Sequence, residues 1–213
     1  MAVITISREV GSDGTKIGKE VAKRLNYKYA DKELIQEIVN HYDVTEFEGF
    51  YASGLGLWDK YIRGTDMILK LLNKIILSIA KSGNVVILGR GSFVILREYT
   101  DVLNVAIREP MNVRVHNVMK NENITDIVKA NETMQHQEKM RLSFIENAYH
   151  VKWNLIDNFD MVFDTEKIKS SLVIEMIITA AQTLDKETSS VSGVLTSQIP
   201  VNEIIDNVVK EML

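Results

Sequence analysis

The chain has 213 residues, 46% of them hydrophobic and 25% charged, which is the composition of a soluble globular protein rather than a collagenous, disordered or repeat protein. It contains no cysteine, and this excludes a disulfide framework, a zinc ribbon, an iron–sulfur cluster and a thiol nucleophile. The net charge of -4 argues against binding of nucleic acid through a broad basic face.

No apolar run in the sequence approaches the roughly 20 residues that a membrane-spanning helix needs. The first residues enter a strand-like run without the basic start of a signal peptide. The absence of cysteine also fits a reducing compartment. We therefore expect a cytoplasmic protein that has neither a membrane nor a nucleic acid as a partner.

The first half of the chain alternates short β-branched runs with segments of helical periodicity. In chain order, we predict a strand at 3–6, a glycine-containing loop at 7–16, a helix at 17–25, a strand at 27–30 and a helix at 34–39. The next residues, 44–64, are rich in aromatic residues and glycine and have no sustained period. This pattern favours an irregular or weakly helical insert.

The second half continues the alternation. We predict a helix at 67–80, strands at 85–88 and 102–107, and a helix that begins at Pro110. A long polar helix within 124–149 that projects from the core, a strand at 161–163 and a helix at 172–184 follow. The continuous apolar run at 85–88 is typical of a strand buried on both faces. Together these elements predict an α/β fold, with a three-layer parallel sheet flanked by helices.

The end of the chain has a different character. Residues 185–198 are the most linker-like stretch of the sequence, and residues 201–213 form a short amphipathic helix. This helix could pack on its own sheet or on another subunit, so a homodimer is one of two open arrangements.

The loop at 7–16 is the most informative segment for function. A loop between a first strand and a helix presents backbone N–H groups to a ligand, and this makes it a candidate phosphate cradle. Neither Gly11 nor Gly14 begins a strict G-x-x-x-x-G-K-[ST] match, however. From the pattern alone, an ordinary strand-to-helix turn is an equal alternative.

Several segments, taken in order, resemble the cytidylate kinase-like proteins, a divergent branch of the P-loop nucleoside monophosphate kinases. The runs that carry the resemblance are Ile-Thr-Ile-Ser-Arg at 4–8, Gly-Ser-Asp-Gly at 11–14, Tyr-Ala-Asp-Lys-Glu-Leu-Ile at 29–35 and Val-Val-Ile-Leu-Gly-Arg-Gly at 85–91. The helix with Arg114, the segment 139–141 and the strand at 161–165 follow in the same order. The resemblance covers residues 3–184.

The resemblance implies a P-loop kinase-like domain at 1–184, with an insert at about 41–80 that closes on the acceptor and a helical lid at about 121–150. It leaves 185–213 as a linker and a C-terminal helix. The activity that it implies is transfer of the γ-phosphoryl group of ATP to a nucleotide or another small-molecule acceptor. ATP and Mg²⁺ are the cofactors that such chemistry uses.

The resemblance also implies three groups of site residues. The donor phosphates would be held by Ser7, Arg8, Gly11, Ser12, Asp13, Gly14, Thr15 and Lys16. The acceptor would be held by Asp31 and by Arg90, whose guanidinium can bind a phosphate in a bidentate manner. The charge of the transition state would be stabilised by Lys16, Arg114, Lys139 and Arg141.

Each of these residues has a structural alternative. Asp31 is equally well explained as the N-cap of the next helix. Arg114 has the pattern of a solvated helix arginine that pairs with a nearby acid, and Lys139 and Arg141 resemble any polar surface helix. Trp153 could stack on a base or pack in a small subcore. For the metal, the ligands stay open: Thr15 and Ser12 are hydroxyl candidates for metal or phosphate, whereas His136 is not favoured because it has no second ligand at a suitable spacing.

Three departures from the family pattern leave a second hypothesis open. Lys16 is displaced by one position from the lysine of the P-loop, and Asp13 places a carboxylate where phosphates should bind. Gly91 follows Gly-Arg where kinases of cytidylate often have an aspartate, so the motif does not support cytidylate specificity. The alternative function is therefore a non-catalytic nucleotide-binding or interaction protein that retains the fold.

Overall fold

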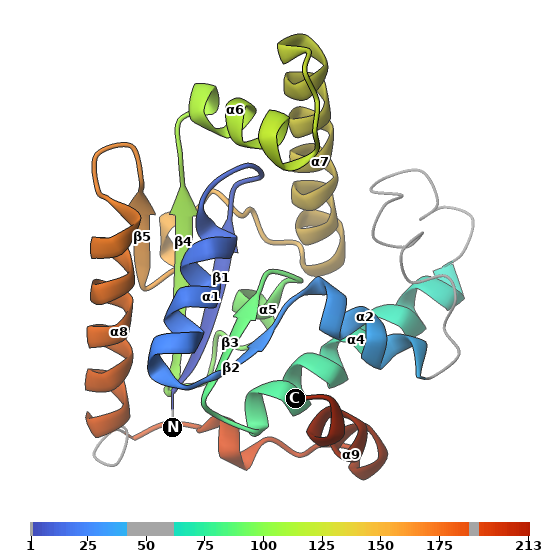
Figure 1. Cartoon of the computed structure of the whole chain (residues 1–213). Helices are drawn as coiled ribbons and strands as arrows, with labels where there is room; N and C mark the ends of the chain where they lie inside the picture. Colours follow the sequence, from blue (N-terminus) through green and yellow to red (C-terminus); the bar gives the residue numbers. More distant parts are fainter. Residues whose placement is uncertain (1, 42–61, 188–191) are drawn as a thin grey trace.

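The computed structural model describes residues 2–41, 62–187 and 192–213. Its centre is a sheet of five parallel strands in the order β2-β3-β1-β4-β5 (Figure 1). The strands are β1 (Val3–Arg8), β2 (Lys28–Ala30), β3 (Val85–Leu88), β4 (Val102–Arg108) and β5 (Met161–Asp164). All five predicted strands are confirmed, whereas the insert predicted at 44–64 lies almost entirely outside the described residues.

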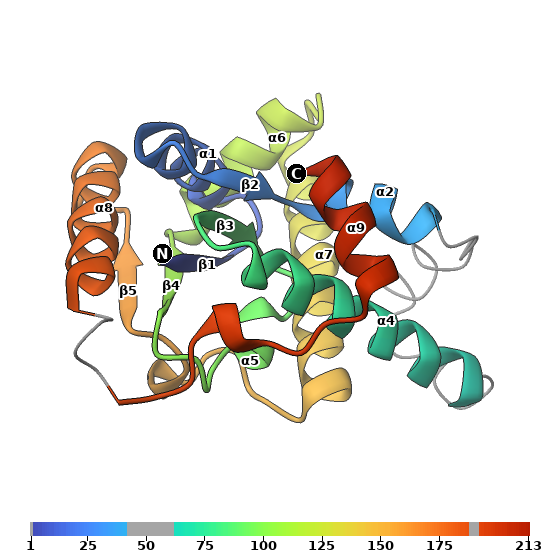
Figure 2. The same cartoon turned by 90° about the horizontal axis from the view of Figure 1, so that it is seen from below.

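The helices form a layer on each face of the sheet. One layer consists of α1 (Gly14–Leu25) and α8 (Ser170–Glu187), which pack against each other and on one side of the strands (Figure 2). The opposite layer consists of α2 (Lys32–Asn40), α4 (Ile62–Lys81), α5 (Ser92–Ile95) and α9 (Glu203–Met212). The predicted three-layer α/β architecture is therefore confirmed.

Strand β3 shows how the two layers are built from the sequence. Its residues Val85, Val86 and Ile87 are 0% exposed. Alternate side chains go to opposite faces, so Val85 and Ile87 join the core beneath α4 and α9, whereas Val86 and Leu88 join the core beneath α1 and α8. A strand covered on both faces has no polar side, which explains the continuous apolar run.

Two helices lie beyond the carboxyl ends of the strands. They are α6 (Met111–Asn121), which follows β4, and α7 (Ile127–Tyr149), and they pack against each other (Figure 1). The prediction that the whole of this polar region projects from the core is wrong for the end of α7. Phe144 and Ile145 are buried there in the core beneath α4. This anchor fixes α7 over the edge of the sheet.

The C-terminal segment packs on its own chain. Asp101 accepts hydrogen bonds from the backbone N–H of Thr196 at 2.9 Å and from its hydroxyl at 2.6 Å, and Thr196 is buried. Helix α9 then lies beside α4 (Figure 2), where buried Ser78 donates to Asp206 at 2.8 Å. Of the two arrangements open from the sequence, the helix thus packs within the subunit, on a helical layer rather than directly on the sheet.

The order of the strands opens a crevice at the carboxyl edge of the sheet. Neighbouring strands β1 and β3 are followed by α1 on one face and α5 on the other, so their loops leave in opposite directions. Open α/β sheets bind ligands at such a point. Among the described residues, no helix combines the length and apolar character required to cross a bilayer.

Candidate functional site

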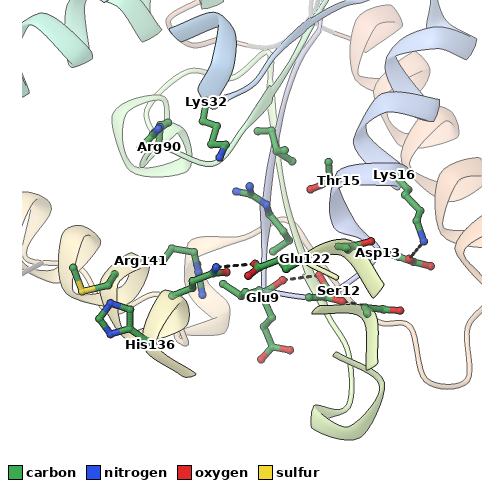
Figure 3. A pocket seen from close by; sticks show the side chains of 18 residues that line it. Glu9, Ser12, Asp13, Thr15, Lys16, Lys32, Arg90, Glu122, His136 and Arg141 are labelled. Atoms are coloured by element: carbon green, nitrogen blue, oxygen red, sulfur yellow. Dashed lines mark hydrogen bonds and ion pairs between the residues drawn. The ribbon is translucent and has the colours of Figure 1, made fainter. Parts of the chain in front are cut away.

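The carboxyl edge of the sheet carries a cavity of about 960 Å³, which we call the main cleft. Figure 3 shows Lys32 and Arg90 on one side, Asp13 and Lys16 on another, and Arg141 on α7. Of the predicted site residues, eight line this cleft: Arg8, Gly11, Ser12, Asp13, Thr15, Lys16, Arg90 and Arg141. The fold thus brings together residues that are more than 130 positions apart.

The loop between β1 and α1 depends on its two glycines. Gly11 has a φ of +82°, and a Cβ at this position would lie 2.5 Å from the carbonyl oxygen of Arg114. A Cβ at Gly14 would collide with the side chain of Arg8. The loop is therefore pressed between α6 and Arg8, and only glycine fits at either position.

Lys16 and Asp13 neutralise each other on the α1 side of the cleft. Lys16 Nζ lies 2.7 Å from Asp13 Oδ1, and Ser170 donates a hydrogen bond to Asp13 Oδ2 at 3.0 Å (Figure 3 draws the Lys16–Asp13 pair). Burial raises the pKa of Asp13, but the hydrogen bonds from Lys16 and Ser170 outweigh it and leave the pKa below its ordinary value. The carboxylate is therefore charged at neutral pH.

We expect Asp13→Asn to bind ATP about five-fold more tightly than the wild type. The substitution removes a carboxylate that repels phosphate by about 1 kcal/mol across a solvated distance of 4 Å, and it releases Lys16. Asp13 is the N-cap of α1 but makes no side-chain capping bond, so no cap is lost. Titration calorimetry with Mg·ATP measures the affinity. Glu175→Gln, which removes an exposed carboxylate paired with Arg24, is the matched control. Weaker ATP binding by Asp13→Asn would refute the repulsion.

Two further carboxylates lie at the loop, Glu9 within it and Glu109 beside it. Glu9 accepts a hydrogen bond from the backbone N–H of Glu109 at 3.0 Å. Burial raises the pKa of Glu109 above its ordinary value, and the charge on Asp13 acts in the same direction, whereas the hydroxyl of Thr165 lowers it by hydrogen bonding. This part of the site is acidic, so anion binding depends on the arginines that face it.

The turn after β3 holds Arg90 in an unusual backbone conformation. Three successive residues have positive φ values, +74° for Gly89, +57° for Arg90 and +77° for Gly91. Arg90 is only 8% exposed and lines the main cleft. A non-glycine residue at positive φ is uncommon and costs free energy, which is typical of functional positions.

The packing of α7 explains the glycine at position 91. A Cβ at Gly91 would collide with the aromatic ring of Tyr149, which lies at the end of α7 and donates a hydrogen bond to Asn73 at 2.9 Å. An aspartate at position 91 is therefore incompatible with this turn. The departure noted in the sequence has a structural cause, namely the close approach of Tyr149.

A carboxylate on α7, Glu138, connects this helix to the loop. Glu138 Oε2 accepts hydrogen bonds from the backbone N–H of Val10 at 2.7 Å and from Arg114 Nη2 at 3.0 Å, and Oε1 accepts one from Arg141 Nη2. Arg114 also donates from Nε to the carbonyl of Val10 at 2.7 Å and lies 3.5 Å from Glu9. Arg114 is thus buried and paired with acids instead of solvated, and it does not line the main cleft.

Four other predicted residues also lie outside the lining of the main cleft, among them Gly14, whose contact with Arg8 is described above. Asp31 Oδ1 accepts hydrogen bonds from the backbone N–H groups of Glu33 and Leu34, which is the geometry of an N-cap. Lys139 is exposed and lines a separate hollow beside α7. Ser7 is buried and lines a small cavity behind the cleft, which we call the inner cavity.

Helix geometry explains why Lys139 and Arg141 do not face the same side. Two residues along an α-helix turn by about 200°, so they project in nearly opposite directions. The side chains of α7 that line the main cleft are His136, Gln137, Met140 and Arg141, and their spacing follows one helical face. The spacing can be read from the sequence. It groups Arg141, but not Lys139, with the face of α7 that lines the main cleft.

Sequence reasoning also missed polar residues from other elements of the cleft. Lys32 is adjacent to Asp31 at the start of α2, and Asn117, Asn121 and Glu122 come from α6 and its end. Asn117 donates a hydrogen bond to the carbonyl of Gly11 at 2.8 Å, which ties α6 to the loop. Lys32 lies within the run at 29–35 that carries the family resemblance, whereas no local motif marks Asn117, Asn121 and Glu122, which the fold alone brings to the site.

The oxygen groups at the start of α1 fit the magnesium ion that the family resemblance implies. The hydroxyl-bearing residues Ser12 and Thr15 line the main cleft at this helix N-terminus. Within residues 2–41, 62–187 and 192–213, no cluster of three or more His, Cys, Asp or Glu could hold a metal ion. Mg²⁺ commonly keeps phosphate oxygens and waters as ligands and needs few protein groups.

Comparisons with known proteins agree with this architecture. Residues 3–167 match the model of the cytidylate kinase-like family. A cytidylate kinase of Pyrobaculum calidifontis is 27% identical over 168 residues, which are 78% of this chain and 84% of that protein. A cytidylate kinase of Pyrobaculum islandicum is 25% identical over 166 residues, with the same coverage of 78% and 84%.

Solved structures support the fold. A crystal structure of an uncharacterized protein from Eubacterium ventriosum superposes with a TM-score of 0.70 at 23% identity, covering 85% of this chain and 98% of that one. Shikimate kinase from Bacteroides thetaiotaomicron gives a TM-score of 0.50 at 17% identity, covering 87% and 98%. The parallel sheet, the glycine loop before α1 and the match over most of its length place this chain in the cytidylate kinase-like family.

Proposed function

We propose that this protein is a kinase that transfers the γ-phosphoryl group of ATP to a nucleotide or another small acceptor. The observation that carries the proposal is the main cleft itself, in which the β1–α1 loop faces Arg8, Arg90 and Arg141. Phosphoryl transfer needs positioning and charge neutralisation more than covalent chemistry. A glycine loop at a helix N-terminus opposite convergent arginines provides both.

Each part of the cleft has a distinct role in this proposal. The backbone N–H groups at the start of α1 bind the donor phosphates, and Thr15 supplies a hydroxyl for the Mg²⁺ that accompanies them. Mg²⁺ supplies charge neutralisation on the phosphates when bound. Arg90 orients the acceptor, and Arg141 approaches from α7 to stabilise negative charge on the transferred group.

Lys16 contributes after a change of partner. Its ammonium is paired with Asp13, but the side chain is 75% exposed, and exposed ion pairs contribute only about 0–1 kcal/mol. A bound triphosphate can therefore compete with Asp13 for Lys16. We place the activity in the cytoplasm, in keeping with a chain that has no cysteine.

A non-catalytic nucleotide-binding role is the second candidate. It is favoured by the engagement of loop groups with protein carboxylates, since Glu138 accepts from the Val10 N–H and Asp13 holds Lys16. Under this reading the fold binds a nucleotide but the cations do not reach the transferred phosphate.

Two measurements on the whole chain separate these functions. Mg·ATP is expected to raise the melting temperature, as a ligand that binds only the folded state does. ADP release is then followed with a panel of nucleoside monophosphates and with shikimate. Release that depends on an acceptor supports the kinase, and stabilisation without acceptor-dependent release supports the non-catalytic role. The absence of any stabilisation by ATP, ADP or GTP would exclude both.

A further inference from the structure

A small inner cavity lies behind the main cleft and shares its arginines. Its volume is about 10 Å³, and Arg8, Arg90 and Arg141 line both it and the main cleft. Trp153 lines the inner cavity from the segment after α7. A space of this size holds one water-sized group, so a ligand in the main cleft could place a single oxygen atom there.

Two hydrogen-bond donors that line the inner cavity are buried without an acceptor. Trp153 is 7% exposed, and its indole Nε1 makes no hydrogen bond to the described part of the chain. The same holds for Nε of Arg141. Neither an indole nor a guanidinium can accept a hydrogen bond. The group that satisfies them must therefore be an acceptor.

The two donors are held rigidly against each other. The guanidinium of Arg141 stacks on the indole of Trp153 at 4.3 Å from the ring centroid, and Trp153 packs edge-on against Phe159 at 5.8 Å. Glu138 binds Nη2 of Arg141 and so fixes the guanidinium from its other end. Preorganised donors bind without loss of side-chain freedom.

The charges around the inner cavity select the kind of acceptor group. Three arginines line it, and no aspartate or glutamate of the described residues does. An anionic oxygen is favoured over a neutral carbonyl or hydroxyl, because hydrogen bonds to charged groups are stronger and the arginines add attraction.

We propose that the inner cavity binds an anionic oxygen of the acceptor substrate, from a phosphate or a carboxylate, with Trp153 Nε1 and Arg141 Nε as donors. The inference rests on the proposed function only in assigning the anion to an acceptor. It makes Trp153 a specificity-determining residue, and it selects small acceptors that carry a terminal oxyanion.

The indole proton of Trp153 reports directly on this contact. The chain has two tryptophans, so a proton–nitrogen NMR spectrum of the wild type has two indole signals, and Trp153→Phe identifies the one that belongs to Trp153. Titration with inorganic phosphate is expected to shift this signal saturably. A second titration with acetate tests whether a carboxylate binds in place of a phosphate. Sodium chloride at equal ionic strength is the blank. A shift with phosphate alone assigns a phosphate, and a shift with acetate alone assigns a carboxylate.

Trp153→Phe tests the donor itself, because it keeps an aromatic ring for Arg141 and removes the N–H together with the five-membered ring that carries it. We expect its phosphate affinity to fall about ten-fold, the typical effect of losing a hydrogen bond to a charged group. Lys129→Gln, which removes an exposed cation elsewhere on α7, should leave the affinity unchanged. A thermal melt confirms that each variant is folded.

Three results would overturn the inference: a Trp153 signal that no oxyanion moves, an equal shift with chloride, or wild-type phosphate affinity in a folded Trp153→Phe variant. Mg·ATP binding is measured on the same samples. A saturable phosphate shift without ATP binding would retain the anion site and reject the proposed kinase. ATP binding without the phosphate shift would reject the anion site and retain the proposed kinase.

Discussion

Arg90→Ala is expected to weaken acceptor binding severely while ATP binding persists. Arg90 is almost fully buried at the end of β3, and it lines both the main cleft and the inner cavity. A bidentate guanidinium contact with a phosphate or carboxylate contributes about 2–4 kcal/mol, so its removal weakens binding roughly thirty- to thousand-fold. Calorimetry with the acceptor identified by ADP release, and separately with Mg·ATP, measures the two affinities.

The backbone of Arg90 provides a matched control. At a φ of +57°, alanine keeps the strain that arginine has, whereas glycine relieves it. Arg90→Gly should therefore be at least as well folded as Arg90→Ala and should lose the same acceptor affinity. Equal losses in both variants assign the effect to the guanidinium. Wild-type acceptor affinity in either variant would remove Arg90 from the acceptor site.

Much of the fold could be predicted because its signals are local. The run at 85–88 identifies a doubly buried strand from four residues, and Pro110 marks the start of α6. The position of α9 could not be predicted in this way. An amphipathic face shows that a helix is covered but not what covers it, and the buried Ser78–Asp206 hydrogen bond joins residues that are 128 positions apart.

The site was predictable to the extent that its residues follow strands. Arg90 and the β1–α1 loop lie at the carboxyl edge of a parallel sheet because β3 and β1 end there. To predict which side chains of α7 face the main cleft, the rotation of the residues around the helix axis is also needed. This rotation places Arg141 and Lys139 on different sides of the helix. The role of Trp153 needed the three-dimensional structure, because its stacking on Arg141 depends on the path of the chain after α7.

Glu138 shows the limit of sequence reasoning most clearly. It is one acid among many on a polar helix, and nothing near it in the sequence indicates a special role. Its partners Val10 and Arg114 lie 128 and 24 residues away. Only the docking of α7 beside α6 and the loop turns this carboxylate into the junction of three elements.

We expect Glu138→Ala to lower the free energy of unfolding by about 3 kcal/mol. The side chain of Glu138 is 17% exposed and those of Arg114 and Arg141 are 11% exposed, so the substitution leaves two buried guanidinium groups without this carboxylate. Breaking a buried pair by removing one partner costs about 3–5 kcal/mol. The lower end applies because Arg114 keeps its contacts with Glu9 and with the carbonyl of Val10. Urea denaturation measures the change.

Mg·ATP should stabilise Glu138→Ala more than it stabilises the wild type. Glu138 accepts from a backbone N–H of the loop and from two arginines, which are donors of the kind that phosphates use. A triphosphate can occupy donors that Glu138→Ala exposes, so Mg·ATP should raise its melting temperature by more than that of the wild type.

Glu132→Ala, an exposed site on the same helix, should change stability by less than about 0.5 kcal/mol. If Glu138→Ala has the same free energy of unfolding as Glu132→Ala, the carboxylate does not hold α7 to the loop. If instead Glu138→Ala loses stability but its melting temperature gains no extra shift from ATP, Glu138 holds α7 to the loop without competing with a phosphate for these donors.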